Sequence, residues 1–282
     1  MSLSRIRIAS VPYINAEPLT WGLMHGPYRE MFQVDRVPPA GIPDLLRSGQ
    51  VDVGLIPVIE LWRQEGLEIL PRIGIASKRR ARSVFLASKG PLEAIRHVAL
   101  DEGSRTSAAL LRILLARRGL HGITFTPAAP SLRDMLQGSD AALLIGDPAL
   151  TADTRGLQVL DLASEWFAMT GLPFVFAVWA RRTEVHLPDG IRPFLDSRRM
   201  GVDAIARIAV TAAAKLQLDP GSVEEYLRVN IHYFLGSEED QALQLFHGHA
   251  IDQGLVPSPA GWLPQDLNPA PVATSSPARE GP

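Results

Sequence analysis

Strand-like and helix-like segments alternate along most of this chain. β-Branched and aromatic residues gather in short runs at 5–10, 32–37 and 51–56, and the residues of the first run alternate between apolar and polar. The apolar spacing of residues 42–48 is typical of a helix, and Pro18 suits the first turn of another that begins just after the first strand. This order of elements predicts an α/β fold whose first strands are parallel.

The same alternation starts again near residue 97 and continues to about residue 179. It predicts further strands and helices, the strands at 98–100, 123–125, 141–145 and 174–179 and the helices at 108–116 and 132–136. After residue 181 the sequence becomes helical, and we expect these helices to pack back on the first unit. The pattern therefore predicts two lobes, residues 1–89 with 180–263 in lobe 1 and residues 90–179 in lobe 2.

Composition excludes several classes of function. The 282 residues are 46% hydrophobic and 21% charged, and a net charge of −2 gives no electrostatic reason to expect nucleic acid as a partner. The chain has no cysteine, and its seven histidines include no His-x-x-x-His pair, so we expect neither a disulfide nor a metal site. Residues 264–282 lack periodicity and are rich in proline and serine, which predicts a disordered tail.

The chain shows no apolar run of the length of a signal peptide or of a membrane span. We therefore expect a cytoplasmic protein that does not contact a membrane. A monomer and a homodimer are both compatible with the sequence.

Four loops that follow predicted strands are the best candidates for chemistry. They are residues 12–15, 56–60, 104–107 and 145–149, two from each lobe. Ligands of α/β proteins bind where strands end, so the four loops should converge on one ligand in a cleft between the lobes. Asn15 lies in the first loop, at the junction between a strand and a helix, with its amide free to face that ligand.

The motif Ser104-Arg105-Thr106-Ser107 precedes a strongly apolar helix. The amides at a helix N-terminus, the three hydroxyls and the Arg105 guanidinium together suit a carboxylate. Simple N-capping of the helix by Ser104 or Thr106 is the alternative. Three hydroxyls and an arginine exceed what one cap needs, which favours ligand binding.

Gly146 and Asp147 end another apolar strand, where a glycine lets a ligand approach the backbone closely. For Asp147 a role in the site and a role as a helix cap are equally compatible with the sequence. The chain has no glycine-rich phosphate loop and no nucleophile elbow, and none of the four loops contains a histidine. These features favour a small carboxylated ligand over a nucleotide.

At these residues the chain resembles the chorismate dehydratases of the futalosine route to menaquinone. The resemblance covers most of residues 5–260, and its most specific words are Val11-Pro-Tyr-Ile-Asn15 with Pro18-Leu19, Val51-Asp-Val-Gly54, Ser83-Val84, Ser104-Arg-Thr-Ser107, Leu144-Ile-Gly-Asp147, and Trp166 with the run from Thr170 to Trp179. It implies the two-lobed, type II fold of periplasmic binding proteins with the ligand cleft between the lobes. It also implies that chorismate is the substrate and that the reaction needs no cofactor.

The resemblance assigns roles to individual residues. Asn15 would hold the reacting groups, and the substrate would contact Ser83, Ser104, Arg105, Thr106, Ser107, Gly146 and Asp147. The general base would be either Asp147 or the substrate's own side-chain carboxylate, and we favour the second. Pro57 departs from the family, in which serine or threonine is frequent, so this loop supplies no hydroxyl here.

Two other functions remain open at this level. One is a non-enzymatic protein of the same fold that binds a small carboxylate. The other is the related 1,4-dihydroxy-6-naphthoate synthase, which differs in its first loop and has a catalytic histidine with no evident counterpart in this chain.

Overall fold

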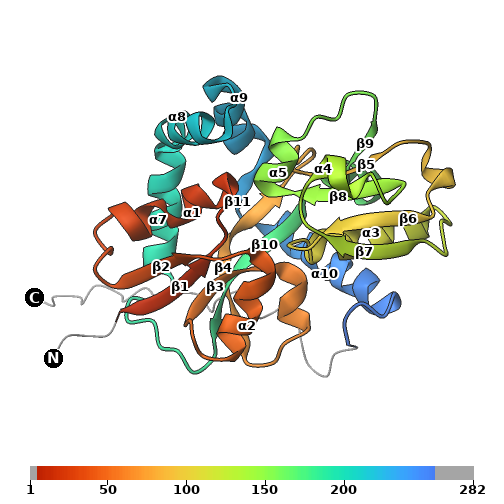
Figure 1. Ribbon diagram of the computed structural model, residues 1–282. Helices are drawn as coiled ribbons and strands as arrows, with labels where there is room; N and C mark the ends of the chain where they lie inside the picture. Colours follow the sequence, from red (N-terminus) through yellow and green to blue (C-terminus); the bar gives the residue numbers. More distant parts are fainter. Residues whose placement is uncertain (1–4, 258–282) are drawn as a thin grey trace, which may run out of the picture.

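The computed structural model describes residues 5–257, which form two β-sheets with helices packed around them (Figure 1). The predicted tail at 264–282 lies outside the described residues. No helix within residues 5–257 is long and apolar enough to cross a membrane.

The first sheet has six strands in the order β11-β4-β10-β3-β1-β2. Its core is parallel because β1 pairs with both β2 and β3 in the same direction, while β10 runs antiparallel between β3 and β4. All five residues of β3 are buried, as expected for a central strand covered on both faces. The strands are β1 (Ile6–Ser10), β2 (Phe32–Arg36), β3 (Val53–Pro57), β4 (Leu67–Ser77), β10 (Phe174–Arg182) and β11 (His232–Phe234).

The second sheet has five strands in the order β7-β6-β8-β5-β9. Its strands β6, β7 and β8 are parallel, and β5 runs antiparallel to both β8 and β9. The strands are β5 (Val84–Ser88), β6 (His97–Asp101), β7 (Thr124–Ala128), β8 (Ala141–Ile145) and β9 (Gln158–Asp161). The predicted α/β architecture with two lobes is confirmed, and each lobe is built on one sheet.

The two predicted lobe boundaries were each wrong by one strand. The strand β5, predicted to lie in lobe 1, pairs with β8 and β9 of the second sheet, and β10, predicted to lie mostly in lobe 2, pairs with β3 and β4 of the first. The chain therefore crosses between the lobes just before each of these strands. Both are apolar throughout most of their length, and apolar content does not reveal which sheet a strand joins.

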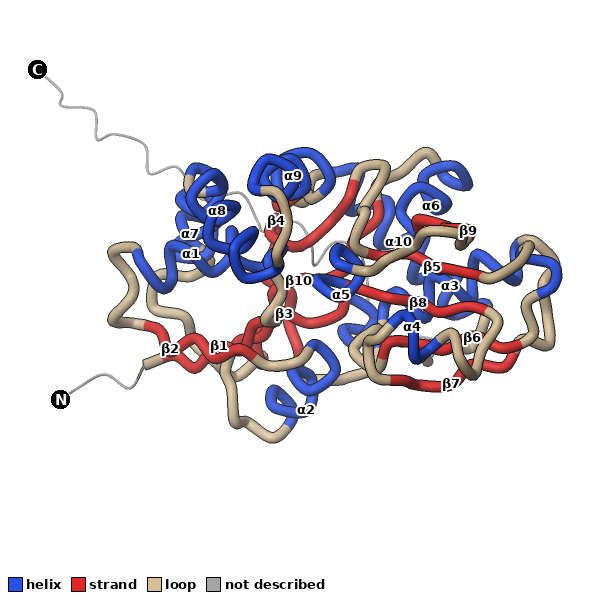
Figure 2. The backbone as a smooth tube through the Cα atoms, turned by 45° about the horizontal axis from the view of Figure 1, so that its top comes forward, coloured by secondary structure: helices blue, strands red, loops and turns tan. Residues whose placement is uncertain are grey.

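Helices cover the outer faces of the sheets (Figure 2). Of the helices after residue 181, α7 and α8 lie beside α1 and α9 packs on α8, so these three belong to the first lobe, as predicted, but α10 lies between the lobes. Its Phe246 ring contacts Trp62 of the first lobe and Trp166 of the second. The helices are α1 (Glu17–His25), α2 (Ile42–Arg47), α3 (Thr106–Arg117), α4 (Leu132–Met135), α5 (Gly146–Thr151), α6 (Leu162–Thr170), α7 (Arg192–Asp203), α8 (Ile205–Leu216), α9 (Pro220–Glu225) and α10 (Ser237–Asp252).

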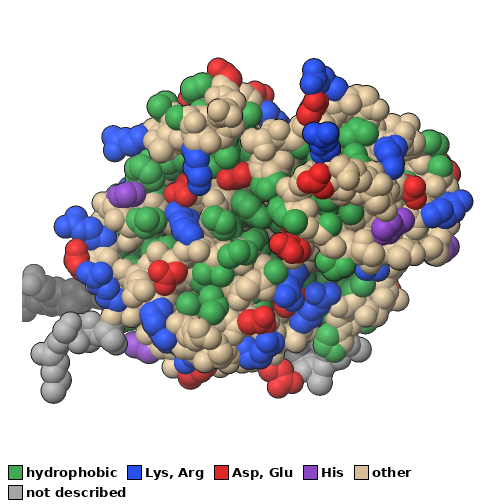
Figure 3. All heavy atoms as spheres, in the orientation of Figure 1, with side chains coloured by type: hydrophobic (Ala, Val, Ile, Leu, Met, Phe, Trp, Pro, Cys, Tyr) green, Lys and Arg blue, Asp and Glu red, His purple; other side chains and the backbone are tan. Residues whose placement is uncertain are grey.

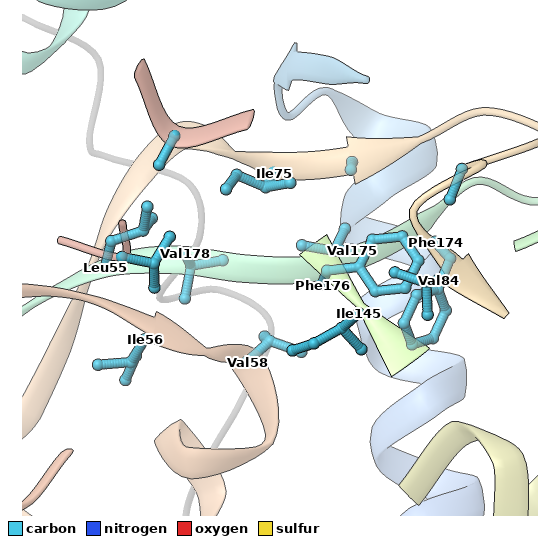
Figure 4. Packing of buried hydrophobic residues seen from close by; sticks show 14 of the residues in the cluster. Leu55, Ile56, Val58, Ile75, Val84, Ile145, Phe174, Val175, Phe176 and Val178 are labelled. Atoms are coloured by element: carbon cyan, nitrogen blue, oxygen red, sulfur yellow. The ribbon is translucent and has the colours of Figure 1, made fainter. Parts of the chain in front are cut away.

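One cluster of buried hydrophobic residues runs through both lobes. Figure 4 shows Val84 and Ile145 of the second sheet beside Phe174 and Phe176 of β10. Trp166 is fully buried, and its ring meets that of Phe174 edge to face at 5.3 Å between centroids. This contact joins α6 of the second lobe to a strand of the first. The cluster therefore holds the two lobes together where the strands end.

The packing of α1 against α7 generates a stability prediction. A Cβ on Gly201 of α7 would overlap the backbone of Pro18 in α1, whereas Gly248 of α10 has open space around it. We expect Gly201→Ala to destabilise the fold by about 1 to 3 kcal/mol through overpacking. Gly248→Ala, the matched control, should stabilise it by about 0.5 to 1 kcal/mol because alanine favours the helix. Urea unfolding of both variants measures these changes, and equal effects would contradict the proposed close approach.

Candidate active site

A cavity lies between the two sheets, at the carboxyl ends of several strands. It holds about 570 Å³ of empty volume, part of it open to solvent. All four predicted loops contribute to its wall, through residues such as Asn15, Pro57, Ser104 and Ile145. Figure 3 shows hydrophobic side chains gathered over the middle of this face of the molecule. The expected convergence of the loops on one cleft is confirmed.

Of the eight residues predicted for the site, all but Asp147 line this cavity. The seven are Asn15, Ser83, Ser104, Arg105, Thr106, Ser107 and Gly146. They come from segments far apart in the sequence. Among the described residues that line the cavity, none is a histidine, a lysine, an aspartate or a glutamate.

Asn15 occupies a short 3-10 helix (Ile14–Ala16) between β1 and α1. Only 9% of the residue is exposed, and its Oδ1 has no hydrogen-bond partner within the described part of the protein. Pro18 stands in the first turn of α1, where it needs no donor, as predicted. A buried amide oxygen without a partner is costly, so this arrangement favours a ligand that donates a hydrogen bond to it.

The N-terminus of α3 opens on the cavity without a side-chain cap. The alternative of N-capping by Ser104 or Thr106 is therefore wrong. The Oγ of Ser104 is buried and has no partner among the described residues. Free amides at a helix N-terminus together with an unpaired hydroxyl form a site for an anionic oxygen.

Asp101 at the end of β6 holds the backbone around this anion site in place. Its carboxylate accepts hydrogen bonds from the amides of Gly103 at 2.9 Å and Ile145 at 3.2 Å, so it joins the loop before α3 to the end of β8. Burial raises the pKa of this carboxyl group. Asp101 was not predicted from the sequence, although it lies only three residues before Ser104.

Arg105 and Thr106 contact the first lobe across the cleft. The Arg105 guanidinium donates to the carbonyl oxygen of Ala40 at 3.0 Å and lies 3.5 Å from Glu60 Oε1. Thr106 Oγ1 accepts a hydrogen bond of 3.4 Å from the amide of Ile59. Both side chains therefore connect the lobes in this arrangement, in addition to lining the cavity.

Ser83 lies where the chain enters the second lobe. The preceding residue, Arg82, has a left-handed backbone conformation with φ of 61°, and Asp161 stabilises this turn by accepting from the Arg82 amide at 2.8 Å. Ser83 is 1% exposed, and its Oγ accepts a hydrogen bond of 2.8 Å from the hydroxyl of Tyr226. Tyr226 was not selected from the sequence, because nothing in its helical stretch distinguishes it from a core residue.

Asp147 connects the lobes behind the cavity wall. Its Oδ1 accepts a hydrogen bond of 2.9 Å from the amide of Ile14, the residue before Asn15. It does not cap α5, which begins at Gly146. Burial raises the pKa of Asp147 to about 6, and the hydrogen bond from Ile14 only partly opposes this shift.

Tyr13 forms much of the apolar wall, and its ring packs against Gly146, whose φ of 62° requires glycine. Burial and the nearby carboxylates raise the pKa of Tyr13, so the ring stays neutral near pH 7. Pro57 also lines the cavity and supplies no hydroxyl, as expected. No cluster of three or more potential metal ligands occurs within residues 5–257.

Comparisons with known proteins assign the chain to a family. Residues 6–252 match the family model described as menaquinone biosynthesis. The chain is 34% identical over 253 residues to the chorismate dehydratase of Thermus thermophilus, a match that covers 83% of this chain and 91% of the relative.

The chain belongs to the chorismate dehydratase family of menaquinone biosynthesis. It is also 25% identical over 241 residues to the chorismate dehydratase of Campylobacter jejuni, which covers 84% of this chain and 93% of that one. Its fold is similar to that of the periplasmic aliphatic sulphonate binding protein of Escherichia coli, with a TM-score of 0.61 at 17% identity and 99% of each chain covered. The predicted resemblance and the two-lobed binding-protein fold are both confirmed.

The contact between Asp147 and Ile14 generates a prediction about pH. In the folded protein the pKa of Asp147 is raised above its ordinary value of 3.8, so the folded state binds this proton more tightly than the unfolded state. Stability is therefore lost as the pH rises from about 4 to about 6. Asp147→Asn keeps an oxygen that can accept from Ile14 and removes the charge. We expect its stability relative to the wild type to increase over this range by at most about 3 kcal/mol.

Urea unfolding at pH values between 4 and 7 measures this difference. Asp147→Ala serves as the control, because it removes both the charge and the acceptor and should lower stability at the acidic end. Parallel stability profiles of the wild type and Asp147→Asn would contradict the assignment.

Proposed function

We propose that this chain converts chorismate to 3-[(1-carboxyvinyl)oxy]benzoate and water, as a step of the futalosine route to menaquinone. The observation that supports it most is the uncapped N-terminus of α3, which faces a largely apolar cavity beside the unpaired hydroxyl of Ser104. Two relatives, both named chorismate dehydratase, agree with this proposal. It includes the expectation of a cytoplasmic enzyme, monomeric or homodimeric, that needs no cofactor.

The reaction removes the ring hydroxyl and the hydrogen on the neighbouring carbon that bears the enolpyruvyl ether. The ring becomes aromatic, which drives the reaction. As the C–H bond breaks, negative charge spreads through the ring double bond onto the ring carboxylate. Amides at the start of α3 and the hydroxyls of Ser104 and Ser107 would stabilise that charge, and they do so more strongly in an apolar cavity than in water.

The general base in this proposal is the substrate's own side-chain carboxylate. The described residues that line the cavity include no carboxylate, histidine or lysine, and Asp147 is engaged with the amide of Ile14 behind the wall. The proton moves from the ring carbon to the substrate carboxylate and then to the leaving hydroxyl, which departs as water. Proton and charge therefore balance without a protein base.

Incubation of the purified chain with chorismate tests the proposal. The aromatic product should appear in the ultraviolet spectrum and at a mass lower than that of chorismate by one water. Folded protein that binds chorismate without forming product would instead support a binding protein. If the chain instead leaves chorismate unchanged and forms 1,4-dihydroxy-6-naphthoate from the substrate of the related synthase, that result would support the synthase.

Asn15→Ala is the first variant to examine. The cavity-facing amide oxygen has no described protein partner, so its removal should leave stability nearly unchanged and reduce kcat by at least about 100-fold. Gln33→Ala, the control, removes an exposed amide on β2 that donates to Asp35, does not line the cavity and should leave kcat unchanged. Substantial turnover by Asn15→Ala would exclude Asn15 from the mechanism.

Substitutions of two buried serines of the second lobe should have different effects, one on activity and the other on stability. Ser104 Oγ has no partner in the described part of the chain, whereas Ser139 Oγ donates to the carbonyls of Met135 at 2.6 Å and Ala141 at 2.9 Å. We expect Ser104→Ala to lower kcat/KM about 10-fold with little change in stability. Ser139→Ala should cost about 1 to 2 kcal/mol of stability with unchanged kcat/KM. Steady-state kinetics and urea unfolding of both variants measure this, and the opposite result would refute the role of Ser104.

A further inference from the structure

Tyr226 places a phenol at the junction of the two lobes. It begins a π-helical turn (Tyr226–Asn230) that follows α9, a kind of irregular turn that is frequent at functional sites. The residue is 1% exposed, and Ile231 just after the turn lines the cavity. The Tyr226 hydroxyl therefore reaches the site from the C-terminal helical segment, behind the cavity wall.

The hydroxyl of Tyr226 is hydrogen-bonded to a residue that lines the cavity. Tyr226 donates its hydrogen to Ser83 Oγ at 2.8 Å. The side chain of Asn15 lies close to the same hydroxyl, where it opposes the rise in the pKa of Tyr226 that burial causes.

This contact determines what the cavity wall offers to a ligand at this point. Ser83 already accepts from Tyr226, so its own hydrogen is available for donation. Asn15 Oδ1 has no partner among the described residues, so it is left as an acceptor at the cavity wall. The phenol thereby fixes a hydroxyl donor in the cavity that Asn15 also lines.

The turn that holds Tyr226 is itself anchored to the entry of the second lobe. The guanidinium of Arg82 donates to the carbonyl oxygen of Ser222 at 3.4 Å and to its Oγ at 3.0 Å, which ties α9 to the residue before Ser83. Because the backbone on both sides is held, the hydroxyl of Tyr226 has little freedom to turn away.

We propose that Tyr226 is a positioning residue for the dehydration, which orients the Ser83 hydroxyl toward the leaving hydroxyl of the substrate. The inference rests on the proposed function. Asn15 Oδ1 accepts the hydrogen of that hydroxyl in the bound substrate, and the Ser83 hydroxyl donates to its oxygen as the C–O bond breaks. The leaving oxygen takes the proton that was removed from the neighbouring ring carbon, so Tyr226 gains and loses no proton.

Tyr226→Phe tests this assignment, because it removes the hydroxyl and keeps the ring. We expect kcat to fall about 10- to 100-fold, the range for losing one hydrogen bond that aligns a reacting group, with KM changed less than about threefold. Tyr233→Phe is the matched control. Tyr233 is also buried, its hydroxyl has no partner among the described residues, and it does not line the cavity. Its variant should keep the wild-type kcat.

A double-mutant cycle distinguishes positioning from a general loss of structure. If Tyr226 acts through Ser83, Tyr226→Phe should lower kcat much less in the Ser83→Ala background than in the wild type. Equal losses in both backgrounds, or a kcat for Tyr226→Phe equal to that of the wild type, would overturn the inference. The wild-type assay separates this from failure of the proposed function, because in that case the wild type itself forms no product.

Discussion

The site depends on the hydrophobic cluster that continues from one sheet into the other. Val84 and Ile145 of the second sheet pack with Phe174 and Phe176 of the first, and Trp166 closes the contact from α6 (Figure 4). Protein interiors are close-packed, so the strand ends on either side of this cluster have fixed relative positions. The polar groups of the cavity lie at those strand ends, so the packing fixes their relative positions as well.

Burial then determines the chemistry that the site can perform. An apolar wall strengthens the attraction between an anion and the amides of α3, and it makes each unpaired polar atom costly. Asn15 Oδ1 and Ser104 Oγ are such atoms, which a substrate can satisfy. The same burial raises the pKa of Asp147 and would penalise a charged base in the cavity. A substrate that brings its own carboxylate avoids that cost.

Local signals accounted for most of the fold and much of the site. Apolar periodicity predicted β1, β3, β8 and α3 among others, but neither α6 nor α7. Strand ends with polar loops indicated Asn15 and the motif from Ser104 to Ser107. The strands β5 and β10 were assigned to the wrong lobes because an apolar run does not encode its pairing partner. Asp101 and Tyr226 were missed because their importance comes from contacts with residues distant in the sequence.

By itself, the sequence determined the fold class, the loops that form the cleft and the family. These depend on periodicity and on short motifs whose residues are neighbours in the sequence. Only the tertiary structure decided that Arg105 and Asp147 connect the lobes and that Tyr226 donates a hydrogen bond to Ser83. The physical reason is that a hydrogen bond depends on position in space to a few tenths of an ångström, and the packing of both lobes sets that position.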